Sequence, residues 1–198
     1  LALHDALFEL VDEKGYDAIS VDEITKRANV GRATFYLHFK DKDDLFLFEF
    51  NEVIAERVKV FSKIPLSLIM TSSENEQDLA GAAAAASLGL VFQHAAENAD
   101  LYRVLLRGQS SLRLSRRLRE MIKQAVDDIL VKKLKNAPTP YDVETTTGLL
   151  AAYFSGALLS TIDWWLDQDQ KIPPEELARM VQHLFFPGVR KLFGFKLT

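Results

Sequence analysis

The sequence of 198 residues contains no cysteine and only four histidines. The lack of cysteine excludes disulfides, thiolate nucleophiles and zinc sites built on thiolates. The sequence also lacks the patterns H-E-x-x-H, E-x-x-H, G-x-S-x-G and G-x-x-x-x-G-K-[ST], which are typical of metal enzymes, hydrolases and phosphate-binding loops. His94 and Glu97 share a helical face, but two ligands make no metal site, and we interpret them as a polar pair beside a pocket. We predict a protein that is not an enzyme and has no cofactor or metal.

Charge is missing from two stretches of 18 residues, 79–96 and 145–162. That length reaches the threshold for a membrane span. Both stretches contain many alanine, serine or threonine residues, and both are flanked by acidic residues rather than by lysine or arginine anchors. We therefore interpret them as buried helices of a soluble protein with no membrane partner. A membrane-associated helical protein is the alternative, and its solubility would depend on detergent.

The composition is 48% hydrophobic, which is sufficient for a buried core, and the net charge is −4. An acidic chain is unusual for a nucleic-acid-binding protein, yet residues 25–42 contain five basic side chains and one acidic one. A local basic patch is what phosphate contact requires, and an acidic remainder limits non-specific binding to DNA. The sequence begins at Leu1 rather than at a methionine, so we expect further residues to precede it.

Residues 20–42 have the pattern of two short helices with a tight turn between them. Ser20 and Glu23 form an S-x-x-E capping box, which predicts that a helix begins directly after Ser20. Residues 29–31, Asn-Val-Gly, interrupt that helix, and a second one is predicted over residues 32–39. This arrangement is typical of a helix-turn-helix, whose second helix lies in the major groove of DNA.

The second helix has one buried and one polar face. Phe35 and Phe39 are four residues apart and fall on the buried face. On the other face, Arg32 can reach a guanine edge, while Thr34 and Tyr36 suit phosphate contacts. The alternative is a helical protein-interaction module in which the hairpin is only a scaffold. Retention on DNA at about 0.1–0.2 M salt would separate these interpretations, because non-specific binding is weak there.

The run Thr-Phe-Tyr-Leu-His-Phe at residues 34–39, followed by Lys42, carries a family resemblance. With residues 15–21 and 28–30 it resembles the DNA-binding signature of the TetR (tetracycline-repressor) family of bacterial transcription regulators. One departure is Gly31, where the family usually has serine as the N-cap of the recognition helix; glycine caps less well by only about a few tenths of a kcal/mol. More loosely, residues 100–194 resemble the C-terminal region of one branch of the family.

The resemblance implies a ligand-responsive repressor that binds a palindromic operator as a homodimer in the bacterial cytoplasm. Residues 1–46 are then the DNA-binding domain, and residues 47–198 the ligand-sensing and dimerisation domain. Six residues are expected to read base edges or to contact or position the phosphate backbone: Arg32, Ala33, Thr34, Tyr36, His38 and Lys42.

The whole chain reads as an all-α protein of about nine helices, with no strand pattern. One helix is expected to end at Gly15, and another to run from Lys42, capped by Asp41, towards Pro65. A long helix up to about residue 135 carries a run of basic residues, which we interpret as a solvated face, with a second DNA-binding face as the alternative. That run consists of Arg113, Arg116, Arg117, Arg119 and Lys123.

The last two helices are predicted to form the dimer interface. Asp142 caps the first of them and Pro174 opens the second. Small residues recur every four positions on the first, which permits close approach of another helix, and apolar residues form a stripe on the second. The predicted interface residues are Gly148, Ala152, Gly156, Ser160, Met180 and Leu184.

An effector pocket is the last prediction. The resemblance implies a cavity within the C-terminal region, and aromatic walls with a few polar groups are typical of small-molecule sites. The effector is therefore expected to be a small, mostly apolar molecule. The alternative, which is the commoner one for any single residue of this kind, is an ordinary core residue. The candidates are Phe61, Phe92, His94, Tyr102, Tyr153 and Trp164.

Overall fold

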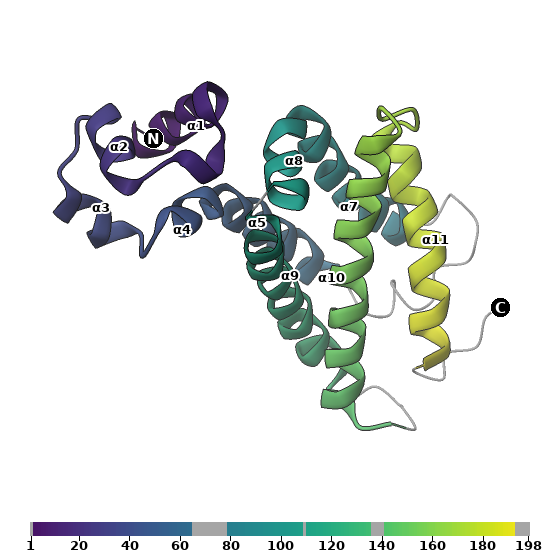
Figure 1. Ribbon diagram of the computed structural model, residues 1–198. Helices are drawn as coiled ribbons and strands as arrows, with labels where there is room; N and C mark the ends of the chain where they lie inside the picture. Colours follow the sequence, from purple (N-terminus) through teal and green to yellow (C-terminus); the bar gives the residue numbers. More distant parts are fainter. Residues whose placement is uncertain (1, 65–78, 109, 136–140, 193–198) are drawn as a thin grey trace. The chain divides into compact units, whose positions relative to one another are not determined.

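The computed structural model describes residues 2–64, 79–108, 110–135 and 141–192, and all regular structure within them is helical (Figure 1). This confirms the all-α prediction. The residues 136–140, with their two prolines, lie outside the described part. The helices are α1 (Ala2–Lys14), the 3-10 turn η1 (Tyr16–Ala18), α2 (Val21–Arg27), α3 (Arg32–His38), α4 (Lys42–Phe46), α5 (Phe48–Lys63), α7 (Leu79–Glu97), α8 (Ala99–Arg107), α9 (Ser111–Leu134), α10 (Val143–Asp167) and α11 (Pro174–Leu192).

The described ranges contain ten α-helices, which agrees with the prediction of about nine. The additional helix arises because the helix expected from Lys42 is divided. Leu47 ends α4 with φ −80° and ψ −4°, and α5 begins at the next residue. The Leu47 side chain is also buried, so packing in the core helps to hold the residue at which α4 ends. Asp100 lies in the first turn of α8, which begins at Ala99.

The first compact unit contains Leu1–Glu52 together with Arg103–Leu118. Within it, α1 packs against α2 and α4, and α2 packs against α3. Gly15 ends α1 with φ 77°, a left-handed conformation that glycine adopts without a steric penalty. Fully buried side chains from four helices fill the centre of this unit: Leu7, Ile24, Phe35, Leu45 and Phe46.

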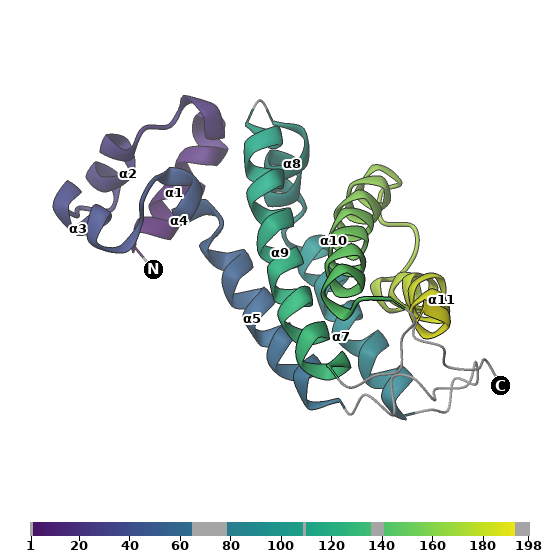
Figure 2. The same ribbon diagram turned by 90° about the horizontal axis from the view of Figure 1, so that it is seen from below.

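The second compact unit contains Val53–Tyr102 and Arg119–Thr198. Its most extensive helix pair is α7 with α11, and α7 also packs against α10 (Figure 2). Phe92 of α7 and Trp165 of α10 are completely buried and meet edge to face, with ring centroids 5.9 Å apart. Pro187 lies inside α11, which continues to Leu192, so the proline interrupts a hydrogen bond without ending the helix.

The boundaries of the two units do not follow the predicted division at residue 46. Helices α5, α8 and α9 each contribute residues to both units. The segment Arg103–Leu118 belongs with the N-terminal helices by its contacts, although it lies far from them in sequence. The assignment of functions to residues 1–46 and 47–198 therefore remains a proposal.

Helix α10 is the single helix in the described ranges that is long and apolar enough, by length and composition, to cross a membrane. Core helices of soluble proteins pass the same test. Ten of its residues are buried against the second unit, from Thr146 to Leu166. This pattern is that of a core helix with one uncovered side.

Candidate nucleic-acid interface

The turn between α2 and α3 is built by local hydrogen bonds. The capping box predicted for α2 is present: Ser20 accepts from the backbone N–H of Glu23, whose carboxylate accepts from the N–H of Ser20. After α2, Asn29 takes a positive φ of 52°, and the N–H of Val30 returns to the carbonyl of Thr25. Gly31 then caps α3 without a side-chain hydrogen bond, as expected for glycine at this position.

Helix α3 has one anchor and a solvent-facing surface. Phe35 is completely buried, and its ring lies 5.8 Å from that of Phe39. Around this anchor, five of the predicted contact residues are exposed and belong to the one short helix: Arg32, Ala33, Thr34, Tyr36 and His38. Leu37, 80% exposed, completes the outward surface. An exposed polar helix face held by one buried ring has the form that insertion into a groove requires.

Arg32 makes contacts within the unit that a nucleic acid would replace. Its Nη1 lies 2.7 Å from Oδ1 of Asp22, and its guanidinium lies 5.8 Å from the centre of the Tyr36 ring. The hydrogen bond to Tyr36 and the charge of Asp22 raise the pKa of Arg32. Both members of the ion pair are more than half exposed, so the pair is weak and exchangeable.

Lys42 is held within the protein. Its ammonium donates to the carbonyl oxygens of Ile19 at 2.7 Å and Tyr16 at 2.9 Å, with a longer contact to Asp17 at 3.4 Å. Burial lowers the pKa of Lys42. The prediction for this residue included both contact with and positioning of the phosphate backbone, and this geometry favours positioning.

The carboxylate of Asp43 lies at the centre of a buried polar cluster. It accepts a hydrogen bond of 2.5 Å from the hydroxyl of Tyr16, and Nε of Arg113 lies 2.5 Å from its other oxygen. Burial, followed by the hydrogen bond to Asp43, raises the pKa of Tyr16, which therefore remains a proton donor. Next to it, Arg117 donates to Asp41 at 2.9 Å. Burial opposes ionisation of Asp41, but the bonds from Arg117 and the Asp44 N–H leave the pKa of Asp41 lowered.

These contacts correct the interpretation of the basic run on α9. Two of its arginines, Arg113 and Arg117, pair with the acidic start of α4, although the Arg113 side chain is still 58% exposed. Arg116 and Arg119 are exposed, as that interpretation predicted. The sequence shows that Arg113 and Arg117, four positions apart, share a helical face and that three aspartates cluster in positions 41–44, but it does not show that the two groups meet.

The predicted effector residues separate into two groups. Phe92 and Tyr102 are buried, and Nδ1 of His94 lies 3.2 Å from the Tyr102 hydroxyl. Burial raises the pKa of Tyr102. Phe61 is half-buried and stacks on the ring of Phe186 of α11. Glu97 accepts a hydrogen bond of 2.9 Å from Gln93 of the same helix.

Tyr153 and Trp164 were wrongly predicted to line an enclosed pocket. They are 62% and 49% exposed, on the outer side of α10. The tryptophan that enters the core is the next residue, Trp165, whose indole donates to the carbonyl of Ile172 at 2.8 Å. One residue turns a side chain by about 100° around a helix, so an error of one position exchanges inside and outside.

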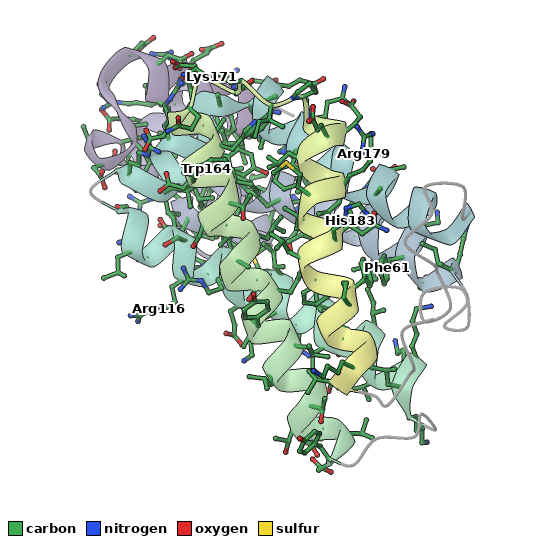
Figure 3. All side chains as sticks on the ribbon, turned by 90° about the vertical axis from the view of Figure 1, so that its right-hand side faces the viewer. Phe61, Arg116, Trp164, Lys171, Arg179 and His183 are labelled. Carbon is green, nitrogen blue, oxygen red and sulfur yellow. The ribbon has the colours of Figure 1, made fainter. Side chains whose placement is uncertain are left out.

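The predicted interface residues on α10 and α11 lie on an uncovered surface. Ala152 and Ser160 are exposed, and an added Cβ at Gly148 or Gly156 would meet nothing within 4 Å. Figure 3 views this side of the two neighbouring helices, with Trp164, Arg179 and His183 labelled. The outer side of α10 and α11 carries large apolar side chains that are between 47% and 80% exposed: Leu149, Tyr153, Trp164, Met180 and Leu184. We call these five residues the α10–α11 apolar face.

Comparison with known proteins agrees with this geometry. Residues 3–47 match the family described as "Bacterial regulatory proteins, tetR family", and residues 85–186 match "Transcriptional regulator C-terminal region". The chain belongs to the TetR family and is a DNA-binding regulator of transcription rather than an enzyme.

Among its relatives is the fatty acid metabolism regulator protein of Bacillus subtilis (strain 168), which is 26% identical over 197 residues and aligns with 93% of this chain and 92% of its own. The crystal structure of FadR from Bacillus subtilis in complex with stearoyl-CoA is similar with a TM-score of 0.56 and 25% identity, over 94% of this chain and 97% of that one. FadR from Bacillus halodurans gives the same TM-score at 23% identity, over 96% and 95% of the two chains.

Proposed function

We propose that this protein is a homodimeric repressor that binds a palindromic operator in the bacterial cytoplasm and releases it when an acyl effector binds. The observation that carries the proposal is the exposed face of α3 around the buried Phe35. Arg32 and Ala33, at the start of α3, read base edges in this proposal. Thr34, Tyr36 and His38 contact phosphates, and Lys42 positions the start of α4.

The α10–α11 apolar face supports the dimer. Large exposed patches of this kind are rare on monomers and mark interaction surfaces. A two-fold axis brings the same face of two copies together, which is the commonest arrangement in soluble oligomers. The open ridge at Gly148 and Gly156 allows the helices of the partner to approach closely. In the operator complex the two copies of α3 then lie about 34–36 Å apart, one turn of the duplex.

The acyl effector is proposed from the relatives and from the composition of the second unit. The B. subtilis FadR structure contains stearoyl-CoA, and its likeness to this protein extends along almost the whole chain. In the present protein, Phe61, Phe185 and Phe186 bring aromatic rings together between α5 and α11. An effector acts by binding more tightly to the dimer conformation that does not match the groove spacing, so it must also bind less tightly when operator is present.

Selection from random DNA tests operator recognition. The expected result is enrichment of a sequence with two inverted half-sites, bound in shift assays at about 0.1–0.2 M salt. Arg32→Ala should weaken binding by about 1–3 kcal/mol and relax the preference at one base pair. Lys171→Ala removes the same charge from an exposed position in the second unit and should leave binding unchanged. Absence of any enriched sequence would favour the alternative, a helical interaction module without specific DNA binding.

Titration with stearoyl-CoA tests the effector. At a concentration one hundred times its dissociation constant, a ligand that binds only the folded protein stabilises it by about 2.7 kcal/mol. The unfolding temperature should therefore rise, and the operator affinity should fall by the reciprocal coupling. Stabilisation without loss of operator binding would contradict the regulatory role of the acyl effector.

A further inference from the structure

Arg57 is an unusual residue on the inward side of α5. It lies one turn before Phe61, so both residues share the helix face that turns towards α11, where the labelled Phe61 lies (Figure 3). The Arg57 side chain is only 17% exposed. Its Nη2 lies 2.8 Å from Glu56, but Nε and Nη1 are buried and have no hydrogen-bond partner among the described residues. Buried guanidinium donors without acceptors reduce the free energy of unfolding, and an acceptor that binds them recovers that loss.

Asp127 on α9 has the complementary deficiency. It is half-buried, and its Oδ1 is buried without a hydrogen-bond partner in the described part of the chain. Leu130 and Leu134 follow it at three and seven positions, which places Asp127 on the same face of α9. That face packs against Leu150 and Phe185 in the interior of the second unit. Asp127 therefore faces the interior together with these apolar residues.

The two groups lie at the same level of neighbouring helices. The ammonium of Lys133 on α9 donates to the carbonyl oxygens of Ser62 and Ile64, at 3.1 and 2.5 Å, at the end of α5. Within the second unit, Figure 2 shows α5 and α9 running in the same direction, and the bonds from Lys133 join their C-terminal ends. Asp127 lies six residues before Lys133, about 9 Å back along α9, and Arg57 lies five residues before Ser62, about 7.5 Å back along α5. No ion pair joins them in the described structure.

Towards the C-terminal ends of α5 and α9, beyond Arg57 and Asp127, the interior is apolar. Phe61 and Phe185 pack against Ile64 and Phe186, and Phe185 also packs against the cluster that contains Leu134. The site thus has a donor-only and an acceptor-only group at one end and aromatic rings at the other. Such a composition suits an amphiphilic molecule with an apolar chain and one polar head.

We infer that Arg57 and Asp127 bind the head of the acyl effector, and that they select a neutral head with a carbonyl oxygen and an N–H group over a carboxylate. A guanidinium only donates hydrogen bonds and a carboxylate only accepts them. A carbonyl oxygen therefore satisfies Arg57 while a neighbouring N–H satisfies Asp127. A free fatty acid satisfies Arg57 but brings a second negative charge towards Asp127. The thioester carbonyl and the first amide of an acyl-CoA supply both groups. This inference rests on the proposed acyl effector and specifies its chemistry.

Three compounds with the same chain test the inference on the unmodified full chain: decanoyl-CoA, N-methyldecanamide and decanoate. Calorimetry should give an affinity for N-methyldecanamide at least tenfold above that for decanoate. In Asp127→Asn the side chain can both donate and accept, so the preference for the amide should fall about tenfold. Arg57→Gln should weaken binding of all three compounds by tenfold or more. Arg119→Gln, which removes an exposed charge from α9, should change neither affinity nor preference.

The head-group comparison needs no variant, so it stands even where a substitution impairs folding. Equal affinity for amide and decanoate overturns the inference, while release of operator by decanoyl-CoA would still support the proposed function. If none of the three compounds binds, the inference and the acyl effector both fail, and operator selection still tests the DNA-binding role. A double-mutant cycle on unfolding of the free protein is the last arm. Strong coupling of Arg57 with Asp127, together with unchanged ligand binding in both variants, would identify a structural pair and also overturn the inference.

Discussion

Tyr16 holds Lys42 in two ways: its carbonyl oxygen accepts from the ammonium at 2.9 Å, and its ring centre lies 4.5 Å from the same nitrogen. The hydroxyl of Tyr16 also donates to Asp43, the next residue along the chain. One tyrosine thus fixes two consecutive residues of α4 to the turn that follows α1. The position of α4 within the first unit depends on this residue.

Lys42→Ala should reduce the stability of the first unit, because three carbonyl oxygens lose a charged donor. We expect a decrease of about 1–3 kcal/mol in the free energy of unfolding, measured by chemical denaturation. Lys40→Ala, at an exposed position on the same segment, is the control and should change stability by less than about 0.5 kcal/mol. The slope of operator affinity against salt should stay near that of the unmodified protein. A decrease of about one in that slope would instead show that the Lys42 ammonium contacts a phosphate.

Asp43→Asn removes the charge from a buried group that accepts from Tyr16 and Arg113. The expected loss is about 1–3 kcal/mol of unfolding free energy, since hydrogen bonds to charged groups are the stronger ones. Arg116→Ala removes an exposed arginine from the same stretch of α9 and should cost less than about 0.5 kcal/mol. Equal effects of the two substitutions would mean that the cluster around Asp43 contributes nothing specific to the fold.

Leu184→Asp should convert the dimer into monomers, because it places a charge in the α10–α11 apolar face, where Leu184 is 80% exposed. Leu112→Asp is the matched control: this leucine is 72% exposed but lies on α9, outside that face. Sedimentation of both variants and of the unmodified protein gives the masses. Gly156→Leu should also yield monomers with an intact fold, since its side chain enters open space within one subunit. A monomeric mass for the unmodified protein would refute the proposed dimer.

Acid should weaken the start of α2 through Glu23. Hydrogen bonds from Lys14 and Ser20 lower the pKa of Glu23 to about 2, whereas the pKa of a glutamate in the unfolded chain is about 4.3. A lowered pKa in the folded state means stabilisation that is complete above the unfolded value and is lost as the pH falls from about 4 to about 2. Glu23→Gln should therefore flatten the dependence of stability on pH in this window. An unchanged pH profile in this variant would assign the acid sensitivity to other carboxylates.

Local signals in the sequence predicted much of this structure. The capping box at Ser20, the caps at Asp41 and Asp142, and the first-turn proline Pro174 all act over three or four residues, and each is present. The exposed face of α3 was predicted for the same reason, since a single buried ring at Phe35 sets its orientation.

Contacts between distant segments could not be predicted in this way. Asp43 and Arg113 are 70 positions apart, and no local pattern states that one is the partner of the other. Trp164 was predicted as a pocket residue, but the packing of α10 buries the neighbouring Trp165 against Phe92 instead. Arg57 and Asp127 likewise become notable only when burial and hydrogen bonding are known together.

The membership of Arg103–Leu118 in the first unit has a consequence for engineered hybrids. Grafting residues 1–46 onto the sensor of another regulator would carry Asp41 and Asp43 along but leave behind Arg117 and Arg113. The transplanted DNA-binding segment would then retain two carboxylates without their native counter-ions. A hybrid that also transfers Arg103–Leu118 keeps these partners, so the exchangeable module of this protein is discontinuous in sequence.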